Sequence, residues 1–79
     1  MTTKAYVLIE TAVGKTKDVL RALEAVRGME AVDAVTGRYD LIAVLTAEDL
    51  NSIGDVVTQS VHTISGIIRT ETCLSVTVR

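Results

Sequence analysis

The order of apolar periodicities along the chain is the feature that most constrains its fold. Four runs rich in β-branched and apolar residues have the composition of strands and occupy residues 4–11, 31–36, 41–46 and 67–78. Two other segments carry an apolar stripe at helical spacing. The stripes consist of Val19, Leu20, Leu23 and Val26 within residues 16–27, and of Leu50, Ile53, Val57 and Val61 within residues 47–62. The predicted order is therefore strand, helix, strand, strand, helix, strand.

This order predicts an α+β fold of the ferredoxin-like βαββαβ type. Each half of the chain is a βαβ unit, and a short loop containing Gly37 joins the two halves as a hairpin. The crossovers place the first and third runs side by side in the middle of a four-stranded antiparallel sheet, with both helices on one face. A length of 79 residues suits one domain, over residues 1–79.

The turns and helix ends are predicted from glycines and capping residues. Glycines fall between the periodic segments at positions 14, 28, 37 and 66, as turn or cap glycines do, whereas Gly54 lies inside the second helical pattern. Thr46 followed three residues later by Asp49 resembles a capping box. We therefore expect Thr46 to cap a second helix that begins near Ala47.

The apolar content predicts a second copy of the chain as a packing partner. Hydrophobic residues make up 48% of the sequence, and the first strand is apolar on both faces. Helices cover one face of the predicted sheet and leave the other bare. Soluble monomers rarely expose a large apolar patch, so we expect the bare sheet face to pack on the sheet of a second copy.

Composition excludes several classes of function. The chain has 8 Lys+Arg, 10 Asp+Glu and only two aromatic residues, Tyr6 and Tyr39, which disfavours a general nucleic-acid binder. It lacks an apolar run long enough to span a membrane and begins without a signal peptide. A single cysteine, Cys73, excludes a disulfide scaffold. These features predict a cytoplasmic protein that binds neither DNA nor a membrane directly.

The inventory of catalytic side chains is small. His62 is the only histidine, and we expect it to be a capping or surface residue. Cys73 lies in a strand, where a small buried hydrophobe is expected. No spacing typical of a metal or nucleotide site occurs. Arg69 and Glu71 lie on one strand face and can pair with each other or across strands. The sequence thus predicts no catalytic residue, no metal and no cofactor, and a protein that is not an enzyme.

Two features remain open when only the residue types are considered. Thr70 and Thr72 share a strand face with apolar residues, so they are either β-branched filler or hydroxyls directed at a ligand. The loop from Gly37 to Asp40 is either a simple hairpin turn or a small-ligand loop. In the second case its backbone N–H groups take a carboxylate and Asp40 takes an ammonium group.

The segment Val35-Thr36-Gly37-Arg38-Tyr39-Asp40 resembles a family hallmark. The pattern V-x-G-x-Y-D is similar to that of the effector-binding (RAM) domain of the Lrp/AsnC transcription regulators. The opening YVLIET run, the helix ending at Gly28 and the final GIIRTET strand are similar to that domain in order and spacing. The resemblance extends from about Tyr6 to Val76 and favours the ligand-loop interpretation.

The resemblance implies a function and an assembly. Domains of this family dimerise through the sheet, form rings of four or five dimers, and bind amino acids between dimers. By this resemblance Gly37, Tyr39 and Asp40 line the amino-acid site, and Thr70 and Thr72 contribute hydroxyls from a neighbouring subunit.

The match with the family has limits that bear on function. It does not settle whether Arg38, at the rim, or His62 contacts the ligand. Full-length members carry a helix-turn-helix domain ahead of this one, and the chain resembles the stand-alone form. We therefore expect a homo-oligomeric module, octameric or decameric, that modulates full-length regulators rather than binding DNA itself.

Three functions other than that of the Lrp/AsnC effector domain remain open. The first is a small dimeric α+β-barrel enzyme, which a pocket with His62 and Tyr6 converging inside one dimer would favour. A purely structural oligomerisation module requires loops packed shut beside Asp40. An amino-acid-binding domain of the ACT class shares the βαββαβ topology and is close in function to the family interpretation.

Overall fold

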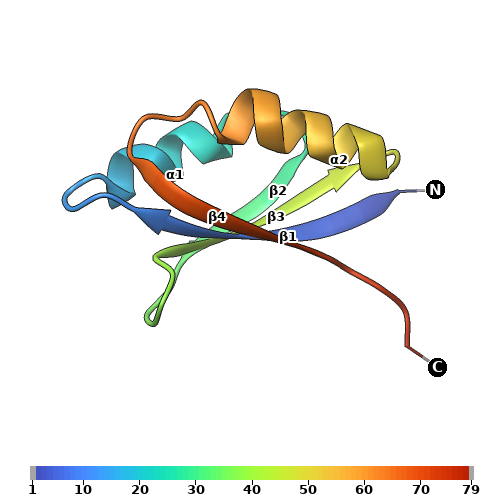
Figure 1. Cartoon of the computed structure of the whole chain (residues 1–79), viewed down its shortest axis with the longest axis horizontal. Coiled ribbons are helices and arrows are strands. Elements are labelled where there is room, and N and C mark those ends of the chain that lie inside the picture. The colour runs from blue at the N-terminus through green and yellow to red at the C-terminus, as the bar shows by residue number, and fades with distance from the viewer. Residues whose placement is uncertain (1, 79) are drawn as a thin grey trace.

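The computed structural model describes residues 2–78 and has the predicted ferredoxin-like architecture (Figure 1). A four-stranded antiparallel sheet has the order β2-β3-β1-β4, and both helices lie on one of its faces. The elements are β1 (Thr3–Thr11), α1 (Thr16–Glu24), β2 (Met29–Ala34), β3 (Leu41–Ala47), α2 (Leu50–Val56), the π-helical turn η1 (Val57–Val61) and β4 (Ile67–Leu74). None of the helices in the described part of the chain is both long enough and apolar enough to cross a membrane.

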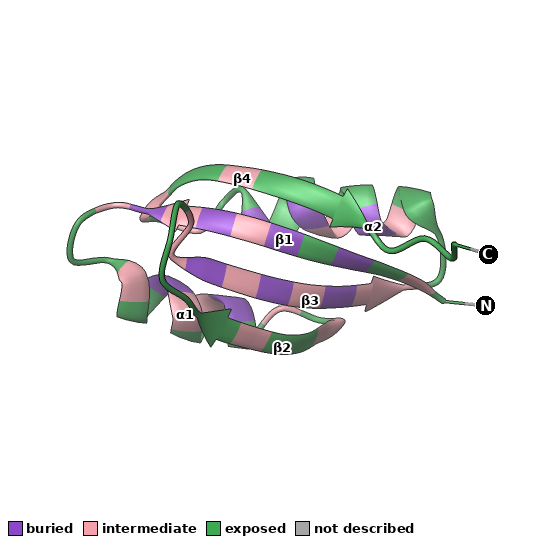
Figure 2. Ribbon diagram, turned by 90° about the horizontal axis from the view of Figure 1, so that it is seen from below, coloured by how far each residue is buried: buried purple, intermediate pink, exposed green. Residues whose placement is uncertain are grey.

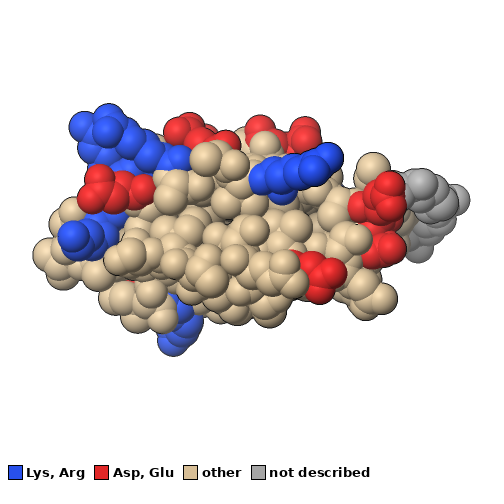
Figure 3. Space-filling view, turned by 90° about the horizontal axis from the view of Figure 1, so that it is seen from above, with Lys and Arg blue, Asp and Glu red and all other residues tan. Residues whose placement is uncertain are grey.

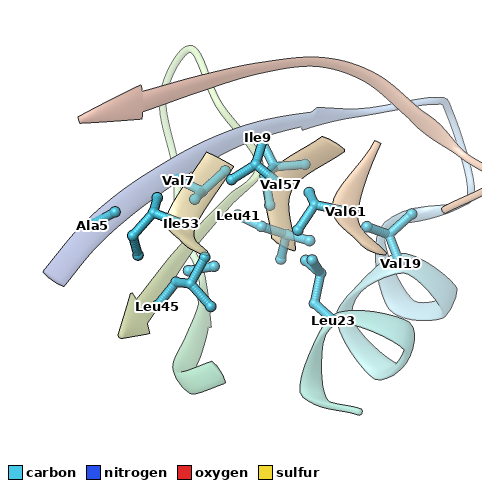
Figure 4. Packing of buried hydrophobic residues seen from close by; sticks show 11 residues of the cluster. Ala5, Val7, Ile9, Val19, Leu23, Leu41, Leu45, Ile53, Val57 and Val61 are labelled. Carbon is cyan, nitrogen blue, oxygen red and sulfur yellow. The ribbon is translucent and has the colours of Figure 1, made fainter. Parts of the chain in front are cut away.

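The core lies between the sheet and the helices. Alternate residues of the two central strands are buried, which gives the banded pattern of β1 and β3 in Figure 2. These side chains meet the apolar stripes of α1, α2 and η1 (Figure 4). The buried hydrophobic residues are Ala5, Val7, Ile9, Val19, Leu23, Leu41, Ala43, Leu45, Ile53, Val57 and Val61. The second predicted stripe is buried except at Leu50, which is 58% exposed. In the first stripe Val19 and Leu23 are buried, whereas Leu20 is half-buried and Val26 lies beyond the end of α1.

The start of the second helix differs from the prediction. Thr46 and Ala47 belong to β3, because β3 remains paired with β1 as far as Thr3 opposite Ala47 and keeps an extended backbone there. The N-cap is Asp49, whose Oδ1 accepts a hydrogen bond from the Ser52 N–H at 2.8 Å. The Thr46 hydroxyl donates instead to Glu30 (3.2 Å). Leu50 is consequently the first residue of α2, and the buried stripe begins at Ile53.

The second helix also changes its winding before it ends. After Val56 the chain continues as η1, and the His62 N–H donates to the carbonyl of Val57, five residues back, at 2.8 Å. Such wide turns occur mostly as single insertions in α-helices, often at functional sites. The helical region ends at Val61, and His62 is the C-cap residue of η1.

Other boundaries shift by a few residues. Helix α1 ends at Glu24 rather than at residue 27, because the following N–H groups bond three residues back, from Val26 to Leu23, and tighten the chain toward Gly28. Strand β2 begins and ends two residues earlier than predicted. Strand β4 ends at Leu74, which is the last residue paired with β1, instead of extending to residue 78.

Gly28 is the glycine that the fold requires most. Its φ is +90°, and a Cβ at this position would lie 2.6 Å from the carbonyl oxygen of Thr46. The Gly28 carbonyl accepts a hydrogen bond from the Thr46 N–H (3.0 Å), so the connection between α1 and β2 is pressed against β3. The predicted turn glycines at positions 14, 37 and 66 also have positive φ.

The sheet face opposite the helices is uncovered, and we call it the open face (Figure 2). Residues directly opposite each other in the register share a face, which assigns this set. The open face consists of Lys4, Tyr6, Leu8 and Glu10 of β1, Ala31 and Asp33 of β2, Ile42, Val44 and Thr46 of β3, and Arg69, Glu71 and Cys73 of β4. Its centre is apolar, whereas β4 contributes two charged side chains at its edge.

Candidate functional site

The candidate site begins at the loop of residues 35–40, which joins β2 to β3. Figure 1 shows this loop projecting on the side of the sheet away from the helices. A hydrogen bond from the Val35 N–H to the Asp40 carbonyl (3.0 Å) closes the hairpin. Gly37 has φ +128°, and no atom lies within 4 Å of the position its Cβ would take. Within residues 2–78, the N–H groups of residues 36–39 donate to no acceptor. The loop tip is therefore exposed and rich in free donors.

Asp40 anchors the loop to the end of β1. Its N–H donates to the carbonyl of Ile9 (2.9 Å), and its Oδ2 accepts the N–H of Thr11 (2.8 Å). The last β1–β3 pair is Ile9 opposite Leu41, so the Asp40 carboxylate takes the place of the strand that has ended. Thr11 is only 8% exposed. One oxygen of Asp40 thus has a structural role that the sequence did not reveal.

Tyr39 lies across the open face. Its hydroxyl donates to Glu71 Oε1 of β4 at 2.8 Å, and the Arg69 guanidinium lies 5.9 Å from the centroid of the ring. The hydrogen bond to Glu71 raises the pKa of the Tyr39 phenol, and burial and the negative charge of Glu71 act in the same direction. Arg69 pairs across strands with Glu10 (3.4 Å), which is one of the two pairings expected for it.

Thr70 and Thr72 lie on the helix side of β4. They are directly opposite Ile9 and Val7, whose side chains are fully buried beneath the helices. Thr70 is half-buried, and its Oγ1 is 3.0 Å from His62 Nε2, while Thr72 is exposed. Within one chain, the structure therefore brings Gly37, Tyr39 and Asp40 together but separates them from the two threonines by the thickness of the sheet.

An open depression lies beside β4 where Thr70 faces His62. It has a volume of about 320 Å³ and is lined by His62, Ile67, Ile68, Arg69 and Thr70. The wide turn η1 ends beside the depression and places His62 in contact with Thr70. Sequence reasoning assigned no site role to His62 or Glu71. Their bonds to predicted site residues are the signal, and those bonds appear only in the folded chain.

Charge is unevenly distributed on the helix side of the molecule. Figure 3 shows Lys, Arg, Asp and Glu gathered toward the ends and along both long edges, around a broad uncharged area. Residues 56–68 contain none of these four residue types. The stretch from residue 56 to residue 68 beside the depression is consequently uncharged, a composition compatible with contact between subunits, and Arg69 is the charged residue of the lining.

Neither a metal centre nor a converging catalytic pair is visible in residues 2–78. This part of the chain has no group of three or more His, Cys, Asp and Glu side chains placed to hold a metal ion. His62 contacts Thr70 on the helix side, whereas Tyr6 lies on the open face. The two side chains therefore lie on opposite faces of the sheet within one chain.

Comparisons with known proteins agree on one family. The model of the family described as "Lrp/AsnC ligand binding domain", which is a regulatory domain and not an enzyme family, matches residues 4–78. The solved structure of TTHA0845 from Thermus thermophilus is 32% identical with a TM-score of 0.91, and the alignment covers 98% of this chain and 96% of that one. FFRP-DM1 is 27% identical with a TM-score of 0.89, over 94% of this chain and 99% of that one.

A more distant structure extends the comparison. The transcriptional regulator NMB0573 from Neisseria meningitidis, solved as an L-Met complex, is 12% identical with a TM-score of 0.85. The alignment covers 95% of this chain and 50% of that one, so the present chain corresponds to about half of that regulator. At this identity the likeness is one of fold. A comparison with curated proteins gave no match.

Proposed function

Because the chain belongs to the Lrp/AsnC ligand binding domain family, we propose that it is an oligomeric regulatory module that binds a small amino acid. The observation that carries the proposal is the construction of the 35–40 loop. Asp40 and Tyr39 fasten the loop to the sheet, while its tip remains exposed with N–H groups free of partners within the described chain. A rigid base under a donor-rich tip is the arrangement expected of a preorganised ligand loop.

The chemistry of the loop suits a zwitterion. An amino acid requires an anion for its ammonium group, donors for its carboxylate and an apolar surface for its side chain. In our proposal Asp40 supplies the anion through Oδ1, which accepts no hydrogen bond from residues 2–78. The loop N–H groups near Gly37 and the hydroxyls of Thr70 and Thr72 supply the donors. The L-Met complex of the Neisseria regulator supports this ligand class.

The proposed site requires more than one subunit. Thr70 and Thr72 lie on the opposite sheet face from Tyr39 in the same chain. We infer that the loop of one subunit meets the threonine side of another. In this assembly two chains pack through their open faces into a dimer, and dimers join through the uncharged surface beside β4 into an octamer or decamer. A ligand between dimers then favours the assembly that presents its site.

Regulation in this proposal acts through partners. The chain carries a net charge of −2, because its 8 Lys+Arg are outnumbered by 10 Asp+Glu, and so lacks the basic excess typical of DNA-binding domains. It modulates full-length regulators of the same family by joining their oligomers. Co-expression with such a regulator tests this part: mixed oligomers are expected, and strictly separate homo-oligomers contradict it.

A ligand screen tests the binding proposal. Thermal shift and calorimetry against the twenty amino acids are expected to identify one or a few that stabilise the protein, by about 2.7 kcal/mol at a hundredfold excess over Kd. Light scattering with and without that amino acid reports the assembly. The variant Thr72→Val removes one proposed ligand hydroxyl, and Thr3→Val in β1 is its control. No response to any amino acid refutes the proposal.

A further inference from the structure

We infer that Glu71 is a positioning residue that couples the 35–40 loop to the packing of a second copy on the open face. The coupling passes through its hydrogen bond with Tyr39. The test with ligand rests on the proposed function. The inference adds a role to Glu71, which neither the sequence pattern nor the family resemblance assigned to the site.

Glu71 holds the loop from a strand that is not adjacent to the hairpin. The other contacts of the loop reach no further than the next strand of the sheet, because Asp40 bonds to the end of β1 and the Val35 N–H closes the hairpin. Tyr39 instead reaches β4, although β1 lies between β4 and the strand that follows the loop. The bond from Tyr39 to Glu71 therefore spans the sheet and joins residues 32 positions apart in the sequence. The view of the open face in Figure 2 shows the loop crossing the sheet surface.

The electrostatics make this bond matter when the open face is covered. Glu71 lies directly opposite Leu8, beside the apolar centre of the face. A second copy packed there removes the carboxylate from water, which is costly unless the charge is hydrogen-bonded. Arg69 is already paired with Glu10, and Cys73 Sγ is 4.0 Å from Glu71, so the Tyr39 hydroxyl is the strong donor available. A covered open face thus favours the loop conformation in which Tyr39 reaches Glu71.

Thermodynamic linkage gives the reverse effect the same size. If covering the open face favours this loop conformation, a ligand that binds this conformation favours the covered face by the same factor. The charged and titratable groups that face Tyr39 in this arrangement are Glu71, Arg69 and Arg38. The direction of its pKa shift agrees with a phenol that donates to a carboxylate.

The first test uses tyrosine absorbance. In a Tyr6→Phe background Tyr39 is the only tyrosine, and the chain has no Trp. The phenol of Tyr39 is expected to titrate above its ordinary pKa, and Glu71→Ala is expected to return the pKa toward that ordinary value. Glu10→Gln, which removes a neighbouring charge of the same face but leaves the bond, is the control. An unchanged titration in Glu71→Ala overturns the inference.

The second test measures dimerisation without ligand. Sedimentation equilibrium gives the dimer Kd for Tyr39→Phe, Glu71→Ala and the double variant. If the bond is the link, Tyr39→Phe is expected to weaken the dimer because it leaves the carboxylate covered without its donor. The double variant is then expected to have the Kd of Glu71→Ala, because Tyr39 has no partner to lose once Glu71 is removed. Glu71→Gln keeps an acceptor oxygen and is expected to restore most of the dimer affinity. Additive effects, or a monomer at every concentration, overturn the inference.

The ligand arm separates this inference from the proposed function. An amino acid that binds the wild type is expected to tighten the dimer by at least about fivefold. In Glu71→Ala that effect is expected to fall below about twofold, although the amino acid still binds. Coupling that survives in Glu71→Ala refutes the inference and leaves amino-acid binding intact. If no amino acid binds the wild type, the proposed function fails, and the two ligand-free tests still decide the role of Glu71.

Discussion

Removal of the Asp40 carboxylate tests whether one residue both supports the sheet and binds ligand. In Asp40→Ala the N–H of Thr11 loses its acceptor, which lies at 2.8 Å. Thr11 is 8% exposed and follows the last β1–β3 pair, so no neighbouring strand offers a replacement carbonyl on that side. A buried donor left without a partner costs about 1–3 kcal/mol, and a hydrogen bond to a charged group contributes about 1.5–3 kcal/mol.

We therefore expect Asp40→Ala to lower the free energy of unfolding by about 2 kcal/mol. Proteins of this length have stabilities of about 4–12 kcal/mol, so the loss is a substantial fraction of the total. It corresponds to a fall in Tm of about 8–16 °C for a domain of this size. Urea denaturation followed by circular dichroism measures the difference.

The matched variant Asp40→Asn separates the two roles. An asparagine oxygen can still accept the Thr11 N–H, so the free energy of unfolding is expected to stay within about 1 kcal/mol of wild type. The negative charge is lost, and the affinity for the amino acid is expected to fall about 10- to 100-fold. Equal stability of Asp40→Ala and wild type refutes the structural role. Wild-type affinity in Asp40→Asn, measured by calorimetry, refutes the charge role.

Three further predictions follow from the geometry. Gly28→Ala is expected to lower the free energy of unfolding by about 2–6 kcal/mol in urea denaturation, since it adds positive-φ strain and places a Cβ 2.6 Å from a backbone oxygen. Its control is Gly54→Ala, in open space within α2, which is expected to stabilise the protein by about 0.5–1 kcal/mol. A larger loss of stability at Gly54 than at Gly28 contradicts the reasoning. The Ser52 N–H holds the pKa of Asp49 below its ordinary value, so the helix-capping contribution is complete at neutral pH and is lost as the pH falls below about 4. The difference in free energy of unfolding between wild type and Asp49→Ala should therefore shrink as the pH falls, and a difference that grows on acidification contradicts this prediction. Leu8→Lys on the open face is expected to weaken the dimer at least about 100-fold in sedimentation equilibrium while the far-ultraviolet spectrum stays native, and an unaffected dimer contradicts the proposed interface.

The sequence predicted the features that depend on local periodicity. Alternation in the strands and helical spacing in the stripes determined the element order, because a buried face demands one periodicity over each segment. Glycines with positive φ marked the turns correctly. The loop after Ala34 was located by the two strand runs and by Gly37, whereas its role as a ligand loop rests on the family hallmark from Val35 to Asp40 and stays a prediction.

The features that failed depend on contacts between distant segments. Thr46 and Asp49 are both good N-cap residues, and the choice between them is made by the pairing of Ala47 with Thr3, far away in the sequence. Likewise, nothing near Tyr39 in the sequence indicates that its hydroxyl reaches Glu71. That contact exists only because β1 pairs with both β3 and β4, which brings the loop before β3 close to β4.

The separation of the five predicted site residues explains why a fold of this kind suits regulation. A pocket built wholly within one chain binds its ligand whatever the oligomeric state. Here the anchored loop lies on one side of the sheet, and Thr70 and Thr72 lie on the other. A ligand that requires both sets must bridge subunits, so its binding energy acts directly on assembly. The sheet keeps the two half-sites apart, and that separation makes the amino-acid site, as we propose it, a property of the oligomer.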